Sequence, residues 1–169
     1  MRKRMVPFLL VLTALPAFGQ DLAALPDAVA LLKGKALADR LDGAIIACLY
    51  GTTDPAKAEA AYELAEWVRA DEFEGTVRYV SKDIVTMFWD APETGFCMVE
   101  TGAMGTDALL ARATTLLDGA GWVVPRLATV EGCPALDLGN GMTLAPTSAG
   151  QDPLCSADEN AALRFQAKN

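Results

Sequence analysis

The chain contains no histidine among its 169 residues. Imidazole carries protons near neutral pH, so its absence excludes Ser-His-Asp and Cys-His catalysis. It also removes the zinc, haem and blue-copper sites that depend on histidine ligands. Serine is scarce, and no CxxC, GxSxG, Walker-type or GxGxxG motif is present. The sequence therefore lacks the common nucleophilic, nucleotide-binding and redox signatures.

The first nineteen residues have the pattern of a secretory signal peptide. Arg2, Lys3 and Arg4 form a basic start, a mostly apolar run covers 6–18, and Gln20 follows small residues. That run is shorter than the about 20 residues that a spanning helix needs. No cysteine follows it closely, which argues against a lipoprotein. We therefore predict a periplasmic or secreted product, free of the membrane, that consists of one domain over residues 20–169.

The charge balance is acidic. Fourteen Lys and Arg face 22 Asp and Glu, for a net charge of −8, and removal of residues 1–19 takes away three basic residues and no acidic one. The product would then carry −11. Such a protein is repelled by phosphate backbones, so we expect no nucleic-acid binding. A basic protein or cationic peptide is the partner that this charge favours.

Four cysteines lie beyond the predicted signal: Cys48, Cys97, Cys133 and Cys155. An even number in an oxidising compartment indicates two disulfides. The expected elements favour the pairs Cys48–Cys97 and Cys133–Cys155 among three possible connectivities. A four-cysteine zinc site is the competing hypothesis, but its close cysteine pairs are missing.

The chain is 52% apolar, enough for a folded core. Asp27 is expected to cap a helix on which Leu37, Leu41, Ile45 and Cys48 share one face, with a possible break at Gly34. Thr53 or Asp54 starts a second helix whose inner face runs from Ala58 to Val68. A third helix is expected from 105 or 106 to Gly119. The expected strands are 76–81, 84–90, 96–101, 122–124 with 127–130, 135–138, 142–145 and 162–166.

Strands that come in runs, rather than alternating with helices, predict an α+β fold. We expect an N-terminal helical hairpin packed on a mostly antiparallel sheet, with one further helix between strand groups and two disulfides. In signal, size and cysteine number, the chain resembles small disulfide-bonded envelope proteins of Gram-negative bacteria. That likeness rests on no specific motif.

Without histidine, acid–base chemistry would fall to carboxylates. Asp71, Glu72 and Glu74 cluster close to Trp67 and Phe73, which is a composition that could handle a sugar. A solvated acidic turn is the competing interpretation. Oxygen ligands for calcium could come from Asp137, Asn140 and Asp152, but the spacing of an EF-hand is absent, and Gly139-Asn140-Gly141 is typical of a turn. We therefore predict no metal and no cofactor.

The function that these observations favour is a non-enzymatic binding or structural module. One alternative is an acidic inhibitor or sequestering partner of a basic envelope hydrolase or cationic peptide. Another is a carboxylate-dependent glycan hydrolase, so an enzyme is disfavoured but remains open. The sequence leaves the oligomeric state open.

Overall fold

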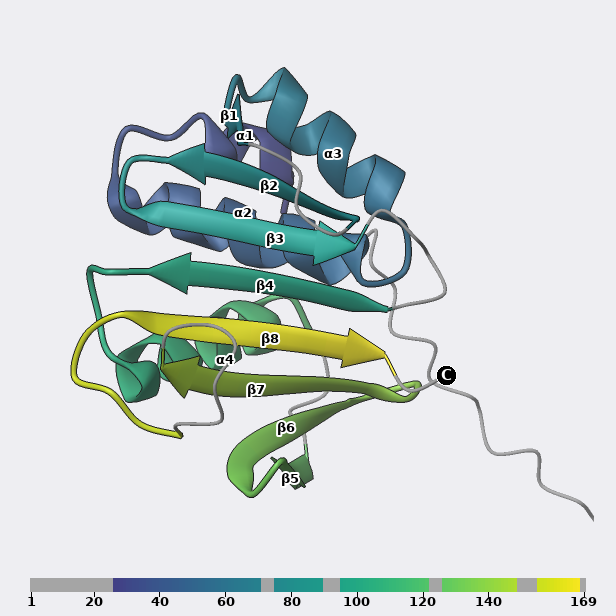
Figure 1. Cartoon of the computed structure of the whole chain (residues 1–169), viewed down its shortest axis with the longest axis vertical. Coiled ribbons are helices and arrows are strands. Elements are labelled where there is room, and N and C mark those ends of the chain that lie inside the picture. The colour runs from purple at the N-terminus through teal and green to yellow at the C-terminus, as the bar shows by residue number, and fades with distance from the viewer. Residues whose placement is uncertain (1–25, 71–74, 90–94, 122–125, 149–154, 168–169) are drawn as a thin grey trace, which may run out of the picture.

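The computed structural model describes residues 26–70, 75–89, 95–121, 126–148 and 155–167. In this part of the chain, eight antiparallel strands form one sheet in the order β1-β2-β3-β4-β8-β7-β6-β5 (Figure 1). The expected α+β fold is confirmed, and the predicted signal peptide lies outside the described residues. Within those residues, no helix has the length and apolar character needed to cross a membrane.

The helices are α1 (Ala28–Leu32), α2 (Leu37–Gly51), α3 (Pro55–Leu64) and α4 (Thr106–Gly119). The strands are β1 (Val68–Arg69), β2 (Thr76–Ser81), β3 (Ile84–Trp89), β4 (Phe96–Thr101), β5 (Arg126–Val130), β6 (Cys133–Gly139), β7 (Met142–Ser148) and β8 (Ala161–Ala167). The strands on each side of α4 form a meander, and the C-terminal strand β8 joins the two by pairing with β4 and β7. The C-terminal strand therefore pairs with a strand from the middle of the chain at the centre of the sheet.

Two of the predicted helix starts are confirmed by capping contacts. The Asp27 carboxylate accepts a hydrogen bond from the Val29 amide at 3.0 Å, and Asp54 accepts one from the Lys57 amide at 3.2 Å. Both side chains satisfy amides that have no partner inside the helix. Gly34 separates α1 from α2, as its place in the sequence suggested.

The second predicted helix ends earlier than its apolar pattern indicated. It stops at Leu64, and Glu66 then adopts a left-handed backbone conformation with φ +61°. Val68, expected on the inner face of the helix, lies instead in β1 with 68% of its side chain exposed. The short strand β1 was not predicted, because two residues are too few for an alternating pattern.

The main core lies between the sheet and the helices. Helix α2 packs on β3 and β4, α4 packs on β7 and β8, and both lie behind the sheet in the view of Figure 1. The rings of Tyr62, Tyr79 and Phe88 stack in this layer, with centroids 5.0 Å apart for the first pair and 6.2 Å for the second. The Cys48–Cys97 bridge joins α2 to β4 directly.

The second bridge, Cys133–Cys155, attaches the segment before β8 to β6. Both predicted pairings are confirmed, and no cysteine of the chain is free. Because all four sulfur atoms are joined in pairs, the hypothesis of a four-cysteine zinc site was wrong. The predicted hairpin at residues 139–141 is also confirmed, with Asn140 at φ +52° between β6 and β7.

Candidate functional site

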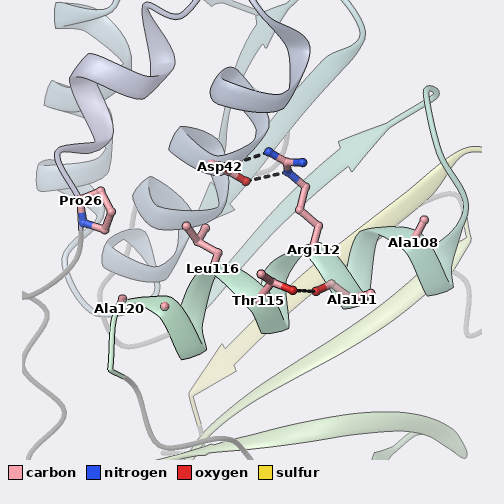
Figure 2. A pocket seen from close by; sticks show the side chains of 9 residues that line it. Pro26, Asp42, Ala108, Ala111, Arg112, Thr115, Leu116 and Ala120 are labelled. Carbon is pink, nitrogen blue, oxygen red and sulfur yellow. Dashed lines mark hydrogen bonds and ion pairs between the residues drawn. The ribbon is translucent and has the colours of Figure 1, made fainter.

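A groove of about 630 Å³ lies between α2 and α4, with Pro26 near the Ala120 end of α4 (Figure 2). This volume falls in the range of typical ligand pockets. Its lining is mostly small and apolar, and consists of Pro26, Asp42, Ala108, Ala111, Arg112, Thr115, Leu116, Gly119 and Ala120.

The sequence of α4 explains why the groove stays open. Leu109, Ala113 and Leu117 recur at helical spacing and are buried against the sheet. The neighbouring face carries Ala108, Ala111 and later small residues, which reach only a short distance from the helix axis. α4 can therefore pack firmly on the sheet while its outer face remains low beside α2.

One wall of the groove is fixed by an ion pair between the two helices. Arg112 Nε donates to Asp42 Oδ1 at 2.7 Å, and Nη2 donates to Oδ2 at 2.8 Å (Figure 2). The same Nη2 donates to the Ala38 carbonyl at 2.9 Å. This two-point geometry is the strong form of an arginine–carboxylate pair. It fixes the guanidinium at the edge of the groove rather than leaving it free in solvent.

The polar groups of the groove are suited to holding a ligand. Arg112 Nη1 makes no hydrogen bond to any described residue, so it can donate to a carbonyl or carboxylate. Thr115 Oγ1 donates a hydrogen bond to the Ala111 carbonyl, one turn earlier in the same helix, at 2.9 Å (Figure 2). Its oxygen lone pairs are left to accept a bond from a ligand.

The carboxylates of the groove bear on the glycan hydrolase hypothesis. The carboxylate of this lining belongs to Asp42, and both of its oxygens accept hydrogen bonds from Arg112. Among the lining residues there is no second carboxylate, whereas glycoside hydrolysis in its usual form needs two facing each other. The groove therefore offers apolar walls, one directed cation and one carboxylate that this cation already binds.

A smaller hollow of about 310 Å³ lies on the other side of Pro26, against α1 and α3. Lys57 Nζ stands 3.8 Å from the centroid of the Tyr50 ring there, a cation–π contact. Leu64, also in its lining, is 62% exposed. Pro26 thus lies at the border of two hollows.

The acidic cluster singled out in the sequence, Asp71, Glu72 and Glu74, lies outside the described residues. Of the calcium candidates, Asp152 lies outside them as well. The Asp137 carboxylate accepts a hydrogen bond from the Gly139 amide at 2.9 Å, which is turn chemistry. Across the described part of the chain, no three Cys, Asp or Glu side chains gather into a possible metal site.

Sequence reasoning did not find the pair of Asp42 and Arg112. The two residues stand 70 positions apart, and each alone looks like an ordinary charge on a helix surface. The available signal was weak: Arg112 is the single cation of α4, placed among small residues. Only the packing of α4 beside α2 gives it a partner.

No protein-family model, curated protein or solved structure matches this chain.

Proposed function

We propose that the chain is a non-enzymatic binding module of the bacterial envelope or the extracellular space, and that its ligand occupies the α2/α4 groove. The observation that carries the proposal is the groove itself: apolar walls, a small-residue floor and the directed guanidinium of Arg112. The matching ligand is a peptide segment or small molecule with an apolar group beside a carbonyl or carboxylate. Arg112 Nη1 would donate to that oxygen.

Covalent chemistry supports the compartment that we propose. Two disulfides persist in oxidising compartments and are rare in the cytosol. The basic and apolar pattern of residues 1–19 supports export by the secretory route. Together they support a periplasmic or secreted protein.

The test fills the groove. Ala111→Trp places a bulky ring on its floor, and Ala56→Trp places the same ring on the exposed surface of α3 as a matched control. Mature, oxidised protein is immobilised and exposed to envelope extract, and bound species are identified by mass spectrometry. We expect at least one species retained by the wild type and by Ala56→Trp and lost with Ala111→Trp. If every retained species tolerates Ala111→Trp, the groove is not the binding site.

A second candidate, an acidic partner for a basic protein or peptide, is favoured by the net charge of −8. Long-range attraction of this kind weakens as salt screens it, whereas a groove contact with apolar walls depends less on salt. Repeating the capture at low and high salt separates the two. A basic species that tolerates Ala111→Trp and is lost at high salt would support the charge-driven partner.

The glycan hydrolase hypothesis stays a prediction with its own assay. Glycan release is measured for the wild type and for Asp71→Asn, Glu72→Gln and Glu74→Gln. Activity that falls by orders of magnitude in one of these variants would support catalysis by that carboxylate.

A further inference from the structure

Strand β5 forms one edge of the sheet and is the longer of the two edge strands. It spans five residues, whereas β1 at the opposite edge spans two. Leu127 of β5 is 89% exposed, more than any other large hydrophobic side chain in the described part of the chain. An exposed apolar edge strand is a template for pairing with another strand.

The usual protections of a sheet edge are missing from β5. Natural edge strands carry a proline, a lysine, a bulge or an inward-pointing charge, or another element covers them. The strand reads RLATV, and its pairing with β6 runs through five consecutive residues without a shift in register. Its single charge, Arg126, stands at the start of the strand, opposite Asp137 of β6. Within its five residues, β5 therefore has no barrier to strand pairing.

The hairpin between β5 and β6 decides which backbone groups face outward. Val130 pairs with Cys133 across the turn Glu131-Gly132, whose φ values are +52° and +86°. Two-residue hairpins of this type close on a hydrogen-bonded pair, and bonded and non-bonded pairs alternate from there. Leu127 and Thr129 therefore direct their N–H and C=O groups away from β6. Within the described residues, no backbone hydrogen bond outside the β5–β6 pairing reaches either of them.

We propose that β5 pairs with β5 of a second copy of the chain, antiparallel and centred on Ala128, so that two sheets join into one. In this register Leu127 lies opposite Thr129 of the second copy, and two-fold symmetry repeats the pair. The outward N–H and C=O groups of both residues are then satisfied. Leu127 packs against the methyl group of Thr129 and, diagonally, against Leu127 of the second copy.

The other self-pairing registers leave these groups unmatched. Centring on Leu127 would place Thr129 opposite position 125, and Pro125 has no N–H to donate. Centring on Thr129 would place Leu127 opposite Glu131, which lies in the turn. The register centred on Ala128 uses the whole edge, so β5 is complementary to itself.

The charges near β5 permit this pairing. Arg126 would lie opposite Val130 of the second copy, so the two arginines stand four residues of strand, or about 14 Å, apart. That distance exceeds the Debye length of about 8 Å at physiological salt. β5 itself carries no carboxylate. The net charge of −8 on each copy opposes approach over longer range, and salt screens this repulsion.

The small contact implies a weak dimer. Five residues a side are far fewer than the roughly 20 to 30 of a standard interface. We expect a dissociation constant on the order of 100 μM. Sedimentation velocity of the mature, oxidised protein, from about 10 μM to about 1 mM at physiological salt, should show the mean mass rising from monomer toward dimer.

Two variants test the edge directly. Thr129→Pro removes an outward N–H and leaves the bonds to β6 in place, so it should stay monomeric over the same range. Leu127→Lys places a charge on the edge and should weaken the dimer at least about tenfold. Leu64→Lys, the same change at an exposed leucine outside β5, should leave it unchanged. Circular dichroism melts check that all three variants fold.

The register is tested by cross-linking. Two copies of Ala128 would form a non-hydrogen-bonded pair with Cα atoms about 4.5 Å apart, which lies within the reach of a disulfide. Ala128→Cys should therefore give a covalent dimer in a mild oxidant, with both native bridges verified by peptide mapping. Arg126→Cys is the matched control, because its thiols would stand about 14 Å apart and should not cross-link.

Four results would overturn the proposal. One is a mass that stays monomeric up to about 1 mM. Others are a dimer that Thr129→Pro leaves intact, and a cross-link that forms with Arg126→Cys but not with Ala128→Cys. The fourth is a monomer whose Leu127 and Thr129 amides gain hydrogen-exchange protection when envelope extract is added, which would assign the edge to a foreign strand.

The dimer and the proposed ligand groove are tested separately. β5 contributes no residue to the lining of the α2/α4 groove. Ala111→Trp, which fills that groove, should leave the sedimentation of the protein unchanged. Failure of one proposal therefore leaves the other standing.

Discussion

Removing the Cys48–Cys97 bridge should destabilise the fold more than removing the Cys133–Cys155 bridge. The first bridge joins α2 to β4 across the core, and both of its cysteines are fully buried. In the second bridge Cys133 is buried, but Cys155 is half-buried. The perturbation is the double substitution Cys48→Ala with Cys97→Ala, matched against Cys133→Ala with Cys155→Ala.

The magnitudes follow from the length of chain that each bridge closes. The separation of 49 residues for the first bridge corresponds to about 4 kcal/mol of loop-closure entropy in the unfolded state. The separation of 22 residues for the second corresponds to about 3 kcal/mol. Loss of two fully buried sulfur atoms adds the full cost of a cavity, of order 1 kcal/mol, to the first double substitution. In the second double substitution this cost is smaller, because Cys155 is half-buried. We therefore expect the first double variant to be less stable by about 1 to 2 kcal/mol than the second.

The assay is equilibrium unfolding in urea, followed by circular dichroism, on mature wild type and both double variants. Mass spectrometry first confirms that the remaining bridge is formed in each. The slope of free energy against urea should rise in both variants, since an unfolded chain with one bridge exposes more surface. Equal stability of the two variants, or a greater loss on removing Cys133–Cys155, would refute the reasoning from loop length and burial.

Three further predictions concern single positions. Asp42→Ala should lower the free energy of unfolding by about 1 kcal/mol, because it leaves Arg112 without its carboxylate; a double-mutant cycle with Arg112→Ala that shows no coupling would contradict this. Burial raises the pKa of Tyr62 above its ordinary value of 10.0, so the unfolded state releases the proton first. Stability should therefore be full below pH 10 and fall as pH rises further, an effect that urea midpoints should show and Tyr62→Phe should reduce. Gly95→Ala should cost about 1 kcal/mol or more, because Gly95 has φ +54° and an added Cβ would lie 2.7 Å from that of Ala167; unchanged thermal stability would count against it.

Much of the fold could be predicted from local patterns. The capping carboxylates Asp27 and Asp54 lie at the helix starts that they predicted. The strands 76–81 and 96–101 have the predicted bounds, and the turn at Asn140 joins β6 to β7. These features depend on neighbours within a few residues, so the sequence displays them directly.

The errors came where packing overrides a local pattern. Apolar spacing continued the second helix to Val68, but Glu66 leaves the helical conformation and the chain turns into β1, which pairs with β2. The pairing of the four cysteines, by contrast, was predicted correctly from the expected proximity of their elements. A hydrogen-bonded edge strand of two residues leaves no periodic trace in a sequence.

By itself, the sequence determined the class of the fold, the number of bridges that its cysteines can form, the acidic charge and the exclusion of histidine chemistry. These properties depend on composition and on short-range patterns. Only the tertiary structure decided that α4 lies beside α2, which makes the groove and unites Asp42 with Arg112. It also decided the strand order, which pairs β8 with β4 and β7 and leaves β5 at one edge of the sheet. Such juxtapositions depend on contacts between segments that are distant in the sequence. Local patterns do not predict the order of strands in a sheet.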